Sequence, residues 1–133
     1  MMTIPVEVGR SLIHGQGVFA LRAVRAGSVI WQFNPGLDQK APATWLKYAE
    51  ESVREFVMER GYLNERDEWV VCIDEAQFLN FPNPGESPNT KLGGKQDGEF
   101  LLLAATDIEP GEEITVPPES DKDYERKMEA RTK

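Results

Sequence analysis

The chain has 133 residues, of which 40% are hydrophobic and 29% charged, a length and composition that suit one domain around one core. Its 15 Lys and Arg against 23 Asp and Glu leave a formal net charge of −8, which argues against nucleic-acid binding through a broad basic face and is compatible with a basic peptide as partner. No apolar run approaches the roughly 18 residues of a membrane span, and residues 1–10 lack the apolar segment of a signal peptide, so we expect a cytoplasmic protein.

The first third of the chain is predicted to form strands and turns. Alternating apolar residues indicate a strand over Ile4–Val8, and the turn Gly15-Gln16-Gly17 leads into a second strand over Val18–Ala20. A run of β-branched and aromatic residues favours a third strand over Val29–Phe33, ended by Asn34-Pro35-Gly36. This part is therefore expected to be β-rich.

The middle of the chain predicts one helix over Thr44–Arg60. Thr44 is a suitable N-cap and Gly61 a suitable stop. Apolar side chains recur between them at three- and four-residue spacing, which places them on one stripe. The glutamates of the opposite side are interpreted as a solvated face.

A strand is predicted again over Trp69–Ile73, where Cys72 would be a buried and inert thiol. Because Cys72 is the only cysteine, an internal disulfide is excluded, and with His14 as the only histidine a metal site of the Cys/His type is implausible. No metal is therefore expected. His14 is interpreted as a loop residue rather than a base.

The last part begins with an irregular segment over Asn80–Asn89, whose prolines and glycine are incompatible with a helix or a central strand. A fully buried strand is predicted over Phe100–Ala105, and a short strand over Glu113–Val116 follows a Pro-Gly turn. Residues 117–133 are expected to be a tail. No linker divides the chain, so residues 1–133 are predicted to be a single domain.

Three motifs follow one another in a fixed order, and each is unspecific alone. Taken together and at this separation, they resemble the SET domain, the fold of many protein-lysine methyltransferases. The motifs are Ser11–Ala20 with Val24–Ile30, then Phe78-Leu79-Asn80 with Ser87–Thr90, and finally Ala104–Val116, which contains the run IEPGEEITV.

The resemblance runs from Thr3 to Val116 and is closest to small bacterial proteins made of a SET domain alone. It implies a mainly β fold of the β-clip type, with short antiparallel sheets, the middle helix as an insert, and a knot-like crossing near the carboxyl end. The core would span residues 3–116, with the Asn80 and Val116 segments side by side.

The resemblance also implies S-adenosylmethionine as cofactor. The backbone of Gly15, Gln16 and Gly17 would hold its methionine end, where glycine permits close approach. The Asn80 side chain would bind the cofactor's amino group, and main-chain atoms of the segment that continues with Phe81 would hold the adenine. The cofactor pocket is thus expected between the Gly15–Gly17 turn and the Asn80 loop.

The asparagine segment departs from the family in two ways. Phe81 stands where histidine normally follows the asparagine, and two residues look inserted before Asn89. Asn83 is therefore an alternative to Asn80, because its distance from Asn89 matches the usual spacing. The preceding Phe78-Leu79 favours Asn80.

A second departure concerns the tyrosine that normally ends the last motif and lies at the methyl-transfer pore. Its position is held by Pro118, which has no hydroxyl, and Pro117 also lacks a backbone N–H. Tyr124 is a possible substitute, although a surface position is the alternative. The resemblance therefore implies a lysine methyltransferase with weak or lost activity, acting on a basic, lysine-containing protein. The alternative is a non-catalytic module that binds S-adenosylmethionine, S-adenosylhomocysteine or a basic peptide.

Two further aromatic residues, Tyr62 and Trp69, are candidates to line a channel for the target lysine, with a core position as the alternative for each. The sequence does not indicate the oligomeric state.

Overall fold

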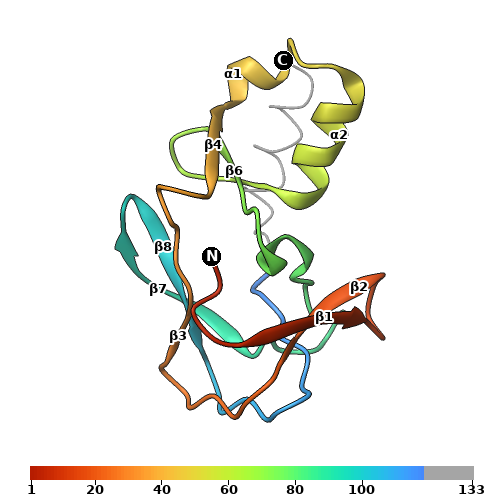
Figure 1. The fold of residues 1–133 in the computed structure, drawn as a ribbon, viewed down its shortest axis with the longest axis vertical. Helices are drawn as coiled ribbons and strands as arrows, with labels where there is room; N and C mark the ends of the chain where they lie inside the picture. Colours follow the sequence, from red (N-terminus) through yellow and green to blue (C-terminus); the bar gives the residue numbers. More distant parts are fainter. Residues whose placement is uncertain (119–133) are drawn as a thin grey trace.

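The computed structural model describes residues 1–118, and Figure 1 shows that it is elongated, with the insert at one end and most strands at the other. Tyr124 and the rest of the tail beyond Pro118 lie outside the described residues. The elements, in chain order, are β1 (Val6–Arg10), β2 (Gln16–Ala20), β3 (Val29–Trp31), β4 (Gln39–Pro42), α1 (Ala43–Leu46), α2 (Glu51–Arg60), β5 (Tyr62–Leu63), β6 (Glu68–Val71), the 3-10 helix η1 (Glu75–Phe78), β7 (Thr90–Gln96) and β8 (Glu99–Ala104).

The strands form three small antiparallel sheets, which confirms the predicted mainly β fold. The sheets pair β1 with β2, place β8 between β3 and β7, and place β6 between β4 and β5. The main core lies among the first two sheets and the loops around them; its fully buried members include Val18, Ile30, Ile108 and Ile114. Within the described part of the chain, no helix is long and apolar enough to cross a membrane.

The predicted single helix is wrong, because the insert is broken into α1 and α2. Leu46 from α1 and Val57 from α2 pack with Trp69 of β6 in a second, smaller core. In one straight helix, Leu46 and Val57 would lie about 16 Å apart along the axis, because each residue adds about 1.5 Å. The break between the helices lets both residues join the same small core as Trp69.

The ends of the insert give one correction and one confirmation. The N-cap is Pro42 rather than Thr44, and no side-chain cap is made. Gly61 ends α2 as predicted, with its N–H donating to the Val57 carbonyl at 2.7 Å. A Cβ at Gly61 would lie 2.7 Å from that oxygen, so the close approach requires glycine.

The carboxyl-terminal strands also differ from prediction. β8 is not fully buried, because Phe100 is 36% exposed and faces a cavity. The strand expected over Glu113–Val116 is reduced to isolated bridges, of which one pairs Phe19 with Glu113 and another pairs Asn80 with Thr115.

The crossing of the last segment with the asparagine loop is confirmed. The Val116 N–H donates to the Asn80 carbonyl at 2.9 Å, on one side of the segment. On the other side, the Thr115 N–H donates to Asn89 Oδ1 at 2.9 Å, and Thr90 Oγ1 donates to the Thr115 carbonyl at 2.7 Å. Residues 113–116 thus lie between Asn80 and Asn89, as the family resemblance implies.

Candidate functional site

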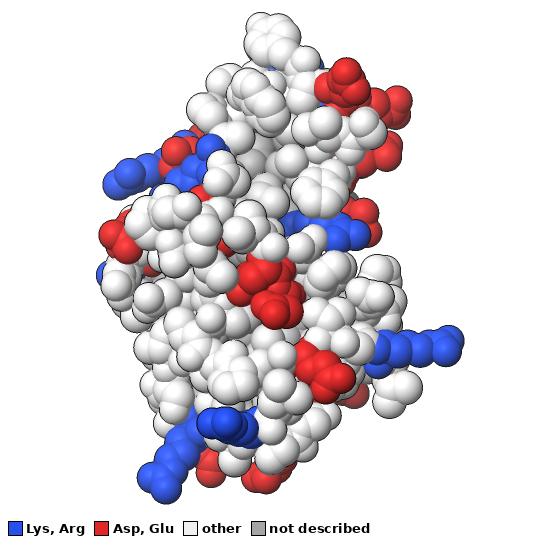
Figure 2. Space-filling model, in the orientation of Figure 1, with Lys and Arg blue, Asp and Glu red and all other residues white. Residues whose placement is uncertain are grey.

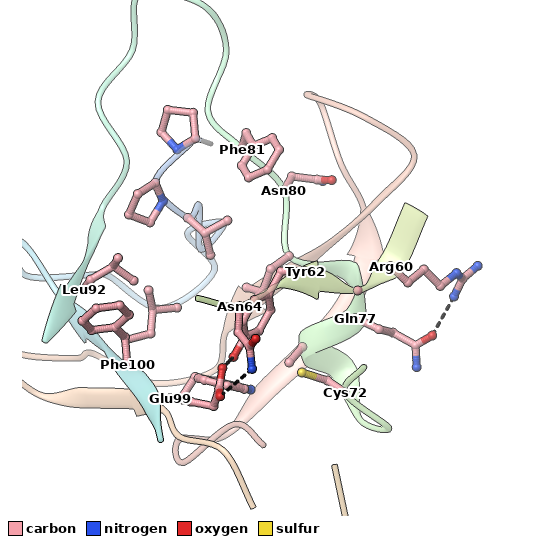
Figure 3. Close-up of a pocket in the computed structure, with 18 of the residues that line it drawn as sticks. Arg60, Tyr62, Asn64, Cys72, Gln77, Asn80, Phe81, Leu92, Glu99 and Phe100 are labelled. Carbon is pink, nitrogen blue, oxygen red and sulfur yellow. Dashed lines mark hydrogen bonds between the residues drawn. The ribbon is translucent and has the colours of Figure 1, made fainter. Parts of the chain in front are cut away.

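A cavity of about 760 Å³ lies between the sheet of β3, β8 and β7 and the insert region. It is lined by residues before β2, from the end of α2 and β5, from η1 and the loop after it, from β7 and β8, and from the last described segment. Figure 3 shows Asn80 and Phe81 on one side of it, and Tyr62, Asn64 and Glu99 on another. Such a volume is in the range of small-molecule sites.

The Asn80 end of the cavity is built around one amide. Asn80 Nδ2 donates to the His14 carbonyl at 3.0 Å, to the Gln16 carbonyl at 2.9 Å and to Glu113 Oε2 at 3.0 Å. All three partners are acceptors, so the amide orientation is determined by the contacts. Among residues 1–118, no hydrogen bond is made to Asn80 Oδ1, which leaves this carbonyl available to a ligand.

Glu113 connects the Asn80 amide to the loop before β2. Its carboxylate accepts from Ser11 Oγ at 2.8 Å as well as from Asn80. A Cβ at Gly17 would lie 2.8 Å from Glu113 Cδ, closer than real contacts permit. The absence of a side chain at Gly17, the second glycine of the Gly-Gln-Gly turn, thus makes room for the Glu113 carboxylate.

The predicted site residues are distributed unevenly around this end. Asn80 and Phe81 line the cavity, whereas the alternative Asn83 is exposed and lies outside its lining. Gly15, Gln16 and Gly17 are also outside the lining, but the carbonyls of His14 and Gln16 hold the Asn80 amide. The assignment of the cofactor to these residues stays a prediction. Pro117 and Pro118 line the cavity too.

Of the two aromatic candidates for a channel, only Tyr62 faces the cavity. Trp69 is fully buried in the second core, so its core alternative is correct. The Tyr62 hydroxyl donates to Glu99 Oε1 at 2.6 Å, and its ring meets Trp31 edge-on with centroids 6.2 Å apart.

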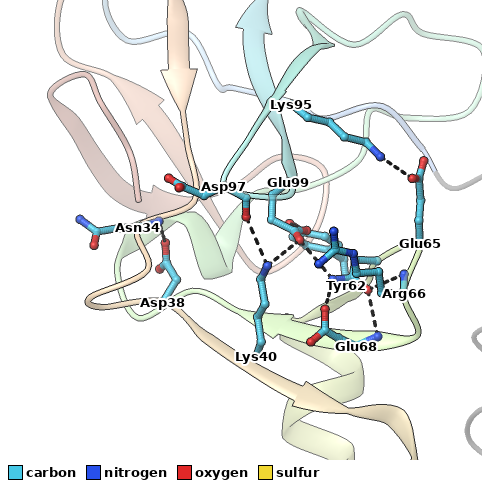
Figure 4. Close-up of polar contacts among 11 residues, drawn as sticks. Asn34, Asp38, Lys40, Tyr62, Glu65, Arg66, Glu68, Lys95, Asp97 and Glu99 are labelled. Atoms are coloured by element: carbon cyan, nitrogen blue, oxygen red, sulfur yellow. Dashed lines mark hydrogen bonds and ion pairs between the residues drawn. The ribbon is translucent and has the colours of Figure 1, made fainter.

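Glu99 is a residue that sequence reasoning missed. Its carboxylate is 3% exposed and accepts from Asn64 Nδ2 at 3.1 Å and from Lys40 Nζ at 2.9 Å, besides Tyr62 (Figure 4). The one available signal was a glutamate directly before the apolar run 100–105. This polar cluster of Tyr62, Asn64, Glu99 and Lys40 is called the Tyr62 end of the cavity.

Burial changes the acidity of two groups on the cavity wall. Burial first, then the hydrogen bond to Glu99, raises the pKa of Tyr62 far above its usual range, so the phenol stays protonated at neutral pH. Burial, followed by the charge of Asp38, raises the pKa of Cys72 to about 12. The Cys72 thiol is therefore buried and unreactive, as expected. Within residues 1–118, no group of three or more His, Cys, Asp or Glu side chains could hold a metal ion.

Comparison with known proteins identifies the family. A family model described as SET domain matches residues 15–117. A solved Plasmodium falciparum protein named as a histone methyltransferase has a TM-score of 0.58 at 13% identity, with 91% of this chain and 99% of that chain covered. A chain of a humanized mutant of the Chaetomium thermophilum Polycomb Repressive Complex 2, bound to the inhibitor GSK126, has a TM-score of 0.58 at 20% identity. That match covers 84% of this chain but 14% of the other. No curated protein sequence matches.

The chain therefore belongs to the SET-domain family, as the three ordered motifs predicted. At these identities the solved structures establish a shared fold, that of SET-domain methyltransferases, and no more. What this particular cavity binds has to be argued from its own residues.

Proposed function

We propose that the cavity binds S-adenosylmethionine, with its amino group at Asn80. The observation that carries this proposal is the commitment of Asn80 Nδ2 to three acceptors, which leaves Oδ1 to accept a hydrogen bond. A ligand ammonium is a suitable donor, and a hydrogen bond from a charged group contributes about 1.5–3 kcal/mol. The Phe81 ring on the same wall offers an apolar surface to a heterocycle.

When bound, the cofactor would supply its methyl group to a neutral amine, whose nitrogen bonds to the methyl carbon as the carbon–sulfur bond breaks. Leu92, Phe100 and Leu102 give the cavity an apolar wall. Such a wall favours the neutral form of a lysine side chain, whose proton would leave to solvent before the transfer. The protein would otherwise contribute by holding the amine and methyl in line.

Methyl transfer by this chain is expected to be slow. Pro118, which the last motif predicts to stand in place of the family's pore tyrosine, lines the cavity and has no hydroxyl to contact the reacting groups. Loss of one well-placed polar group at a reacting centre typically lowers the rate by about 10²–10³. A module that binds the cofactor without turnover is the second candidate, and it is favoured by the same Pro117-Pro118 pair.

The partner in either case would be a basic, lysine-containing peptide. The net charge of −8 favours it. On the face drawn in Figure 2, Lys and Arg lie in separate groups with Asp and Glu between them, so this face offers carboxylates to cationic side chains.

Radiolabelled methyl transfer to a lysine-rich protein mixture tests the proposed loss of activity. The wild type should transfer little or nothing, and the double variant Pro117→Asp with Pro118→Tyr should gain activity. Pro118→Tyr alone is the matched control, because Pro117 still restricts the neighbouring backbone. Robust transfer by the wild type would contradict the proposal, and its loss in Tyr124→Phe would make Tyr124 the substitute.

A further inference from the structure

The insert, residues 43–60, carries exposed apolar side chains that lie outside the cavity. Of the eleven large apolar side chains that are exposed among the described residues, four belong to the insert: Trp45, Tyr48, Val53 and Phe56. None of the four, here called the insert surface, lines the cavity. Figure 2 shows uncharged side chains over the insert, at the top of the view, with Asp and Glu along one edge. Contiguous apolar side chains with a polar border are typical of a surface that a partner covers.

The packing of the two helices leaves this surface uncovered. Leu46 of α1 and Val57 of α2 are the side chains that the helices bury in the core with Trp69. Val53 and Phe56 lie three residues apart on α2, so they are neighbours on the helix, and 38% and 46% of their surface is exposed. The apolar part of α2 is therefore wider than its contact with the core.

A row of glutamates runs along α2 beside these apolar side chains. Glu51, Glu55 and Glu59 recur every four residues, which places them on one side of the helix, and all three are exposed. Their carboxylates make no ion pair with another residue of the range 1–118. Phe56 lies three residues before Glu59, so the two are neighbours on the helix. The charge at this edge of the insert surface therefore complements a cationic partner.

Two rings of the insert surface already contact cations of the chain itself. Lys47 Nζ lies 4.9 Å from the centroid of the Tyr48 ring, and Arg60 Cζ lies 5.2 Å from that of Phe56. The indole of tryptophan attracts a cation more strongly than either ring type. Trp45 is half exposed, and among the described residues no cation lies over its rings. Its indole can therefore accept a cation from outside the chain.

We propose that the insert surface binds an arginine-rich segment of a partner protein. Guanidinium groups would stack on Trp45 and pair with the glutamates of α2, and arginine suits both contacts because its planar group stacks and forms bidentate pairs. The net charge of −8 adds attraction for such a segment and disfavours a second copy of this chain as the occupant. Because the insert surface lies outside the cavity, the inference goes beyond the proposed cofactor and methyl transfer.

Calorimetry with a lysine-free peptide of arginines spaced by glycines and serines tests the proposal. The wild type should bind this peptide more tightly than a matched peptide with lysine at every arginine position. Trp45→Ala should weaken the binding by about 10-fold, the size of one cation–π contact. Glu55→Lys should weaken it by about 3-fold. The matched control is Glu7→Lys, which makes the same change of charge at an exposed position of β1 and should have little effect.

The outcomes separate this surface from the cavity and from a second copy. Asn80→Ala should bind the arginine peptide as the wild type does, whatever happens to S-adenosylhomocysteine, and a loss in Asn80→Ala would place the peptide in the cavity and overturn the inference. Absent binding by the wild type, or equal binding by Trp45→Ala, would also overturn it. Sedimentation that shows a wild-type dimer and a Trp45→Ala monomer would assign the surface to a second copy instead.

Trp45 also offers a test that needs no variant. The other two tryptophans, Trp31 and Trp69, are 6% and 0% exposed, so quenching of the wild-type fluorescence by acrylamide reports mainly on Trp45. The arginine peptide should reduce the quenching, because it would cover the indole. Quenching that stays the same at saturating peptide would contradict the proposal even if Trp45→Ala does not fold.

Discussion

The two ends of the cavity are built by different means. At the Asn80 end, one amide is held chiefly by the main-chain carbonyls of His14, in the loop before β2, and Gln16, at the start of β2, and Glu113 is its only charged partner. At the Tyr62 end, side chains from β4, β5 and the loop after β5 surround one buried carboxylate, that of Glu99 in β8. The first end depends on backbone placement, whereas the second depends on balanced charge. A single side-chain change should therefore cost more at the Tyr62 end.

The largest loss of stability is expected from Glu99→Gln. This variant leaves the Lys40 ammonium without its carboxylate, and removal of one partner of a buried ion pair typically costs about 3–5 kcal/mol. We expect the lower end of that range, because Lys40 keeps 22% of its side chain exposed. Urea unfolding measures the loss.

The matched control for Glu99→Gln is Glu65→Gln. Glu65 pairs with Lys95 at the surface, where both side chains are largely exposed, and such pairs contribute about 0–1 kcal/mol. Equal losses in the two variants would show that the Tyr62 end does not depend on its buried charge.

A smaller loss is expected at the Asn80 end from Gly17→Ala. The new methyl group must displace the Glu113 carboxylate, which then loses Ser11 and Asn80 as donors. We expect about 2 kcal/mol from the overpacking, and weaker binding of S-adenosylhomocysteine. Gly94→Ala is the control, because a Cβ there meets nothing within 4 Å. Wild-type stability in Gly17→Ala would mean that Glu113 moves freely and does not organise this end.

The smallest effect concerns alkaline pH and Cys72. The folded thiol keeps its proton up to a pH of about 12, while the unfolded thiol loses it above an ordinary value of 9.0. The unfolded state is therefore favoured as the pH rises from 9 towards 12, by about 1.4 kcal/mol at pH 10. Cys72→Val should remove this loss between pH 8 and pH 10 in thermal unfolding. An unchanged alkaline loss in the variant would assign it to other groups.

The sequence predicted Asn80 and Phe81 at one end of the cavity, and at the other end it offered Tyr62 as a candidate but not the buried Glu99 beside it. The order and separation of the three motifs predicted the crossing of the last segment with the Asn80 loop, and the hydrogen bond from the Val116 N–H to the Asn80 carbonyl confirms it. No sequence pattern marks Glu99, because a single glutamate before an apolar run looks the same whether it is buried or exposed at the surface. Its role depends on Lys40 and Tyr62, which the fold brings to it from distant positions.

The insert illustrates a second limit of prediction. Its apolar spacing does indicate helix, and the residues of α2 are helical as expected. The break before α2 accompanies the packing of both helices in one core with Trp69 of β6, a residue outside the helical segment, so local periodicity contains no information about it. Similarly, Phe100 is exposed because a cavity lies beside it, although the run 100–105 is apolar throughout.

The most direct test of the account is calorimetric titration of S-adenosylhomocysteine into the wild type, Asn80→Ala and Asn83→Ala. The wild type and Asn83→Ala should bind alike, because Asn83 lies outside the cavity lining. Asn80→Ala should bind about 10–100-fold more weakly, since it removes the Oδ1 acceptor, with thermal unfolding as the control for its fold. Unchanged binding in Asn80→Ala together with lost binding in Asn83→Ala would contradict the account.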